Sequence, residues 1–217
     1  MVTRYHGPGN LSKIINQLPV KFVGGSWCLD FVNTVGGRDH RGAVIRDKLG
    51  GYEDLLAWSI LAGSLERRRA HALARLAGQK PRAAAAVMNR GIELREALHG
   101  LLKSKVEGQA PDAASLNIVR AEISQAQAHR ELVLQDNGYA WVFTESPPAL
   151  DRPLWPVARS AADLLTSAEL ARVRQCAGPE CGWMFLDTSR NHRRQWCDMR
   201  DCGNRAKVRR WRESRRG

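Results

Sequence analysis

Four of the five cysteines in this 217-residue chain fall in its last fifth, in two pairs of equal spacing. The pattern is Cys176-x4-Cys181-x15-Cys197-x4-Cys202. A short pair can fold back so that both thiolates reach one ion, and the longer interval can form a hairpin that brings the pairs together. The spacing therefore predicts a tetrahedral site in which these four cysteines bind one zinc ion. Two disulfides, or four unrelated core thiols, are the alternative.

Ligation of a metal is favoured over disulfides by the expected compartment. The chain opens without the basic-then-apolar pattern of a secretory signal, so we expect a reducing, cytoplasmic location. No segment approaches the ~18 consecutive apolar residues of a membrane span. Four protein thiolates leave no coordination position for water or substrate, so the zinc is expected to be structural. Cys28 lies far away in an apolar stretch and is expected to be a buried small side chain.

Positive charge is concentrated in the same C-terminal segment. The chain has a formal net charge of +12, and residues 176–217 hold 11 of its 34 Lys and Arg against 5 of its 22 Asp and Glu. On a helix that begins near Cys202, one narrow face carries Arg205, Arg209, Arg212 and Arg216. Val208 and Trp211 lie together on an adjacent flank, which we expect to pack against the rest of the protein.

Guanidinium groups spaced by one helical turn repel one another, so this face gains no stability from its neighbours and indicates an anionic partner. We expect that partner to be DNA, with RNA not excluded. The contacts are assigned to Arg193, Arg194, Arg205, Lys207, Arg209, Arg212 and Arg216. The alternative is a solvated basic tail, which is common at chain ends.

The C-terminal segment resembles a known family. Cys202-Gly203-Asn204-Arg205 is the tetrapeptide that names the CGNR zinc fingers, and it follows the run Asp187-x-Ser189-x-Asn191-x-Arg193-Arg194-x-Trp196-Cys197. In that family the finger follows a larger ABATE domain, whose opening motif resembles residues 24–34 (GGSWCLDFVNT); residues 52–58 (YEDLLAW) fit as well. The resemblance covers about 21–212. It implies a DNA-binding protein from a family of proposed stress-induced transcriptional regulators.

The larger region reads as an α+β domain that is mostly helical. Apolar spacing predicts helices at about 52–62, 65–77, 81–108, 112–128 and 154–165, and a short strand within 21–31 leading into a helix at 29–35. Thr166 and Glu169 form a capping box that predicts a short helix before the first cysteine pair. Between 132–134 and 139–143 the apolar period becomes two, and Asn137-Gly138 predicts a β-hairpin.

Two domains are therefore expected. Residues 1–170 would form a sensory or dimerising domain, and residues 171–217 a small treble-clef-like zinc finger. In that finger the first cysteine pair makes a knuckle, residues 183–185 lie in a hairpin, and a helix supplies Cys202 from its first turn.

Motifs for catalysis are absent from the sequence, which has no His-Glu-x-x-His, no Gly-x-x-x-x-Gly-Lys and no Gly-x-Ser-x-Gly. We therefore expect no enzyme. Asp30, Asn33 and Arg38 lie among apolar residues and form a candidate pocket for a small-molecule effector. The alternative, which we favour, is that Asp30 and Asn33 cap or brace the first helix.

The sequence thus favours a DNA-binding transcription regulator with a structural zinc finger. A lone finger contacts too few base pairs for tight operator binding, so a homodimer formed through the larger domain is expected. An RNA-associated or protein-docking zinc module is the alternative.

Overall fold

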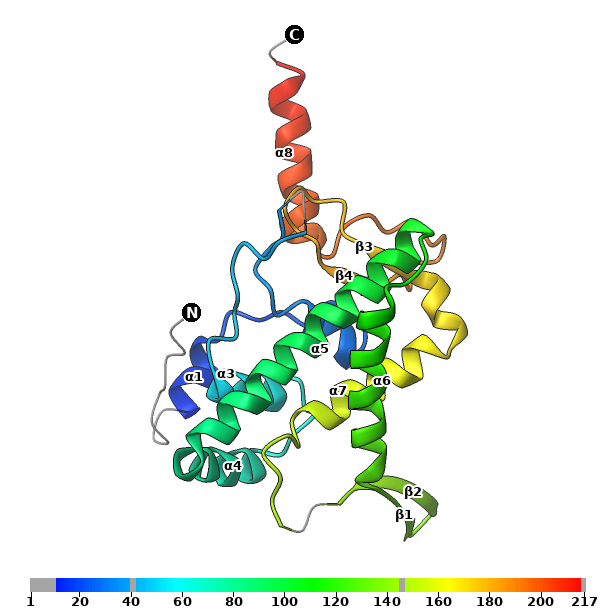
Figure 1. Cartoon of the computed structure of the whole chain (residues 1–217). Coiled ribbons are helices and arrows are strands. Elements are labelled where there is room, and N and C mark those ends of the chain that lie inside the picture. The colour runs from blue at the N-terminus through cyan, green and yellow to red at the C-terminus, as the bar shows by residue number, and fades with distance from the viewer. Residues whose placement is uncertain (1–10, 40–41, 145–146, 216–217) are drawn as a thin grey trace.

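The chain is described by a computed structural model over residues 11–39, 42–144 and 147–215. It is mostly helical, with two small antiparallel hairpins (Figure 1). The helices are α1 Leu11–Gln17, α2 Trp27–Val32, α3 Tyr52–Leu61, α4 Arg67–Gln79, α5 Pro81–Glu107, α6 Ala113–Ala128, α7 Leu154–Leu165, the 3-10 helix η1 Ala168–Arg172, the π turn η2 Met199–Gly203 and α8 Asn204–Glu213. The hairpins pair β1 Arg130–Gln135 with β2 Gly138–Phe143, and β3 Val173–Gln175 with β4 Met184–Leu186.

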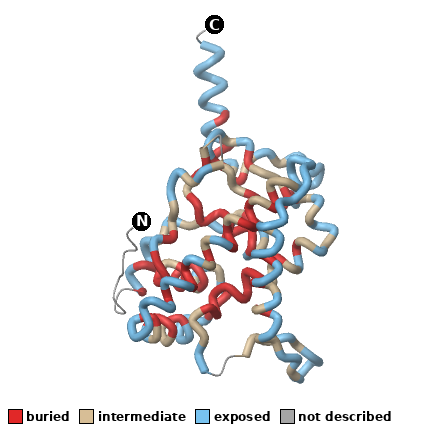
Figure 2. Tube along the Cα trace, in the orientation of Figure 1, coloured by how far each residue is buried: buried red, intermediate tan, exposed pale blue. Residues whose placement is uncertain are grey.

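The longest helix, α5, runs through the middle of the molecule (Figure 1). Pro81 fits its first turn, because the N–H that proline lacks would have no helical partner there. Gly108 ends the helix in the left-handed conformation, at φ 68°, which glycine adopts without steric cost. Leu94, Leu98 and Leu102 recur along its buried face, so one side of α5 lines the core (Figure 2).

One apolar core joins the helical region to the C-terminal hairpin. Phe31 of α2 and Trp58 of α3 are buried at its centre, with their rings 5.1 Å apart. Val173 of β3 and Met184 and Leu186 of β4 belong to the same core cluster. The C-terminal segment is therefore packed into the protein through its hairpin.

A buried ion pair fixes the loop between α2 and α3. Arg95 of α5 is 1% exposed and donates from both terminal nitrogens to Asp47, at 2.8 and 2.6 Å. It also donates to Thr34 at 3.3 Å, next to Asn33 at the end of α2. A planar guanidinium matches a carboxylate in this two-fold manner, so α5 holds the loop in one position.

The predicted helices from residue 52 onward are confirmed within a few residues. The β1–β2 hairpin is confirmed too, but its two loop residues are Asp136 and Asn137, and Gly138 is already paired with Gln135. Asp112 caps α6 by accepting from the backbone N–H of Ser115 at 2.8 Å. Helix α1 lies in a segment for which no element was predicted.

Two local predictions are wrong. Residues 21–26 form no strand, because the backbone of this segment instead makes contact with α2 and β4. Thr166 does not begin a capping box: its hydroxyl donates back to the carbonyl of Ala162 at 2.8 Å and ends α7. Ser167 is the N-cap of η1, without a side-chain capping bond.

Candidate zinc centre and basic helix

The first cysteine pair lies in a knuckle between β3 and β4. Cys176 follows β3 directly, and its N–H donates to the carbonyl of Trp183 at 2.8 Å, which continues the hairpin. The N–H of Cys181 donates to the carbonyl of Gly178 at 3.1 Å and closes the turn. A Cβ on Gly178 would lie 3.1 Å from the sulfur of Cys202 and 3.4 Å from that of Cys176. The knuckle therefore leaves little room for a side chain at position 178.

The second pair is brought to the first by the returning chain and by η2. The N–H of Ala177 donates to the carbonyl of Gln195 at 2.9 Å, which places Cys197 beside the knuckle. Cys202 lies within η2, whose N-cap Asp198 accepts from the N–H of Arg200 at 2.8 Å. Gly203 then leads directly into α8. A knuckle on a hairpin, followed by a helix whose start carries the second pair, is the predicted treble-clef-like arrangement.

The four sulfurs fit a tetrahedral zinc ion. All four lie within 4.8 Å of one another, and the Cys181–Cys197 and Cys197–Cys202 sulfur pairs are each 3.7 Å apart. Zn–S bonds of ~2.3 Å in a tetrahedron place sulfurs about 3.8 Å apart. All five cysteines are free thiols, so disulfides do not compete. The centre therefore fits one structural zinc ion, held by Cys176, Cys181, Cys197 and Cys202.

A cation would stabilise the cluster electrostatically. Proton sharing with Cys176 and Cys181 raises the pKa of Cys197 far above its usual range, because adjacent thiolates repel one another. Backbone N–H groups of Gly178 and Cys197 donate to the sulfur of Cys176, at 3.4 and 3.3 Å. Arg205 donates to the sulfur of Cys202 at 3.0 Å. A divalent ion, assisted by these donors, allows all four sulfurs to be thiolates.

The loop before Cys197 is organised by Asp187, which is fully buried. Its carboxylate accepts from the N–H and hydroxyl of Ser189 and from the N–H of Arg194, at 3.0 Å for the last. The side chain of Arg194 donates to the carbonyls of Trp196 and Cys197 and lies over the ring of Phe185, 4.2 Å from its centroid. The Asp187-x-Ser189 part of the motif is therefore structural, and so is the Arg194 side chain.

The outer edge of β4 is covered by the chain around α2. The side-chain amide of Asn33 donates to the carbonyl of Met184 at 2.8 Å and accepts from its N–H at 2.9 Å. The N–H of Leu186 donates to the carbonyl of Gly24 at 2.8 Å. Trp183 donates from its indole to the carbonyl of Val35 at 2.7 Å. The finger hairpin is thus hydrogen-bonded to the larger region as well as packed on it.

Two lysines from outside the finger also reach it. Lys21 pairs with Asp198, at 3.2 Å, and with Asp201, both beside the second cysteine pair. The ammonium of Lys48 lies 4.2 Å from the centre of the Trp183 ring. Neither contact was predicted, because each joins segments more than a hundred residues apart and no local pattern marks such pairs.

Helix α8 projects away from the rest of the molecule (Figure 1). Ala206 is the only buried residue of Asn204–Glu213 (Figure 2). Val208 and Trp211 are 40% and 54% exposed, so the prediction that they pack against the protein is wrong. The helix leaves the finger at an angle that carries this flank beyond the hairpins.

The predicted nucleic-acid contacts divide into two groups. Lys207, Arg209 and Arg212 are exposed on α8, and Arg193 is exposed on the loop before the second cysteine pair. Arg205 and Arg194 use their guanidinium groups within the finger, as described above, and Arg216 lies outside the described residues. Arg210 and Arg200 are also exposed and basic, but neither belongs to the helical face that the sequence predicts.

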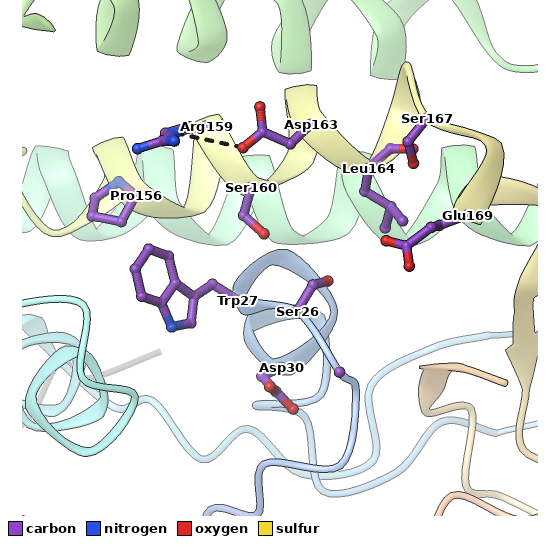
Figure 3. A pocket seen from close by; sticks show the side chains of 11 residues that line it. Ser26, Trp27, Asp30, Pro156, Arg159, Ser160, Asp163, Leu164, Ser167 and Glu169 are labelled. Carbon is purple, nitrogen blue, oxygen red and sulfur yellow. Dashed lines mark hydrogen bonds and ion pairs between the residues drawn. The ribbon is translucent and has the colours of Figure 1, made fainter. Parts of the chain in front are cut away.

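The three residues of the candidate ligand pocket do not meet in one cavity. Asp30 lines a cavity of about 730 Å³ between α2 and α7, where Ser160 of α7 points toward α2 beside Trp27 (Figure 3). Arg38 lines a separate cavity of about 240 Å³ beside the knuckle and donates to Glu96 at 2.7 Å. Asn33 holds β4, and Asp30 accepts from the N–H of Gly24 at 2.8 Å. Asp30 and Asn33 thus brace the chain in the structure.

Residues 25–168, most of the chain, match the ABATE family model, described as "Putative stress-induced transcription regulator". The chain belongs to the ABATE family. Residues 172–215 match the CGNR zinc finger, so the predicted resemblance is confirmed for both parts and in the predicted order. No curated protein matches the chain.

Neither ABATE nor the CGNR finger is a family of enzymes. None of the described helices combines the length and apolar composition needed to cross a membrane. The family description indicates a transcription regulator, and the cysteine cluster provides its zinc centre.

Proposed function

We propose that this ABATE protein regulates transcription by binding duplex DNA through α8, with the zinc centre holding that helix in place. The observation that carries the proposal is the projecting basic helix. Residues 204–213 contain five Lys or Arg and one acidic residue, and α8 exposes nearly all of its surface. A helix of this width fits the major groove of B-form DNA, which is ~12 Å wide.

The charge on α8 is available to a ligand. Among the residues that the structure describes, Arg209 has only an exposed pair with Glu213, at 3.9 Å, and such pairs contribute little in water. Lys207, Arg210 and Arg212 are exposed beside it. Phosphate oxygens would take up this charge and release condensed counterions, which is the main source of affinity in nonspecific DNA binding.

The zinc centre supports α8 at its base. Cys202 lies two residues before the helix, and Arg205 in its first turn donates to the sulfur of Cys202. The metal would therefore fix the direction of α8 without taking part in chemistry. In this proposal Arg194 and Arg205 support the finger, and contacts come from Arg193, Lys207, Arg209, Arg210 and Arg212. The protein would act in the cytoplasm.

The test is the salt dependence of binding to a duplex DNA of mixed sequence. About five phosphate contacts predict a slope of log affinity against log salt of about −4.5. The double variant Arg209→Ala, Arg212→Ala should weaken binding and flatten the slope by about two. The matched control is Arg67→Ala, Arg68→Ala, which removes the same charge from exposed positions on α4 and should leave the slope unchanged.

Two other ligand classes are outcomes of the same measurement. Stronger binding to duplex RNA of the same sequence would replace the DNA proposal with an RNA one. A salt-independent interaction, or a double variant that binds as well as the parent while retaining zinc, would contradict nucleic-acid binding through α8 and favour the protein-docking alternative.

A further inference from the structure

The β1–β2 hairpin carries a second exposed surface that the finger does not use. Leu132 and Leu134 on β1 are 55% and 75% exposed, and Trp141 and Tyr139 on β2 are 53% and 75% exposed. Leu132 pairs with Trp141, and Leu134 with Tyr139. Cross-strand partners share a face, and so do alternate residues along a strand. All four side chains therefore lie on one face, called here the hairpin face.

The contacts described between the hairpin and the rest of the protein lie at its base. Phe143, at the end of β2, lies 5.9 Å from the ring of Trp155 on α7, and Thr144 donates from its N–H to the carbonyl of His129 at 3.0 Å. The distal pair of Leu134 and Tyr139 has the highest exposure of the four. Two-stranded hairpins are marginally stable alone and usually need a further strand or a packed face. The hairpin face is therefore incomplete in a single chain.

We propose that the hairpin face is the interface through which two copies of this chain form a homodimer. The proposal does not rest on DNA binding. A two-fold axis brings one patch against its own copy, so the patch must be compatible with itself. The hairpin face meets this condition, because four neutral side chains cover it. Arg130 lies over the Trp141 ring, 4.7 Å from its centroid.

Charge also favours a second copy at this position. Each chain carries a formal net charge of +12, so two copies repel one another over most of their surfaces. Residues 130–143 contain one basic residue, Arg130, against two acidic ones, Glu131 and Asp136. The hairpin is thus a place where two copies can meet without adding to the repulsion. It lies at the end of the molecule opposite α8, so pairing there leaves α8 uncovered (Figure 1).

The area is sufficient for a small specific interface. Aromatic side chains have roughly 150–250 Å² to bury, so these exposed fractions leave about 500 Å² of apolar surface per copy. Two copies would bury about 1,000 Å² from these four side chains alone, and the neighbouring backbone would bring the total toward the ~1,200 Å² of the smaller specific interfaces. We therefore expect a dimer that dissociates reversibly in the micromolar range.

The experiment is sedimentation velocity of the full-length, zinc-loaded protein from low to high micromolar concentration. The parent should shift from monomer to dimer. The double variant Leu134→Thr, Tyr139→Thr places β-branched residues, which favour strands, at both positions and removes the apolar surface. It should weaken dimerisation at least about tenfold. The matched control, Val133→Thr, lies on the other face of the hairpin and should dimerise like the parent.

Amide hydrogen exchange of the parent protein is a second test of the interface, and it does not require that any variant folds. Protection of residues 130–143 should rise with protein concentration, while protection of α8 should not change. A parent that stays monomeric at high micromolar concentration, or a dimer whose protection appears away from the hairpin, would overturn the proposal. So would a double variant that dimerises as strongly as the parent.

Discussion

Replacing Asn33 by alanine tests how the finger is held. The Asn33 side chain is 2% exposed and satisfies both backbone groups of Met184, which is itself fully buried. Alanine would leave a buried N–H and a buried carbonyl without partners. Each such group costs about 1–3 kcal/mol, so we expect the free energy of unfolding to fall by about 3 kcal/mol.

The same change should loosen the metal. Met184 follows Cys181 by three residues, so opening the edge of β4 exposes the knuckle. If this opening is local, a loss of about 3 kcal/mol should raise the rate of zinc release roughly 100-fold. Asn16→Ala, at an exposed position on α1, is the matched control and should change neither quantity.

Stability would be measured by urea unfolding of the zinc-loaded protein, followed by circular dichroism and tryptophan fluorescence. Zinc release would be followed with a chromophoric chelator. An Asn33→Ala protein within about 0.5 kcal/mol of the parent, with unchanged zinc release, would refute the role of Asn33 as the brace of β4. A variant that loses small-molecule binding but keeps normal stability would instead support the predicted ligand pocket.

Removing zinc should unfold the finger, because structural zinc contributes about 10–16 kcal/mol of apparent binding energy. The helices that remain should also melt at a lower temperature, because Val173, Met184 and Leu186 are part of the main core. An unchanged melting temperature would contradict the shared core. Gly178→Ala should weaken zinc binding, because the added Cβ would crowd the sulfurs of the cluster. The control Gly100→Ala, within α5, should leave the zinc affinity unchanged. Competition with a chelator would measure both affinities. Burial raises the pKa of Asp30 to about 6. The carboxyl group of Asp30 therefore binds its proton more tightly in the folded state than in the unfolded state. As a result, the contribution of Asp30 to stability falls as the pH rises from about 4 to about 6. Asp30→Asn should therefore gain about 1 kcal/mol of stability relative to the parent between about pH 5 and pH 8, and a pH-independent difference would show that Asp30 is not desolvated.

The parts of the structure that sequence could predict depend on local chemistry. Cysteine spacing identifies the zinc ligands, because the few residues between two cysteines decide whether both thiolates can bind the same ion. Pro81 and Gly108 mark the ends of α5. Proline restricts the backbone at its own position, and glycine allows a conformation that other residues rarely adopt. The Asp112 cap and the β1–β2 hairpin follow the same logic of short-range hydrogen bonding.

The parts that could not be predicted depend on what lies beside an element. The helical pattern of α8 shows which flank is apolar, but the exposure of Val208 and Trp211 follows from the direction in which the helix leaves the finger. The role of Asn33 required knowing that β4, 151 residues later, passes next to it. Arg205 follows Cys202 by three residues, so its bond to the thiolate could have been anticipated from the usual contacts of one helical turn.

In the proposed function, the length of α8 would set how much DNA sequence one chain can distinguish. Ten residues at ~1.5 Å each extend about 15 Å, which spans about four base pairs of duplex. A given four-base-pair sequence recurs by chance about every 250 base pairs, while a genome offers ~10⁶–10⁹ competing sites. A pair of chains joined at the hairpins would carry its two α8 helices at its outer ends. The identity of a target would then be encoded chiefly in the distance between two short sequences.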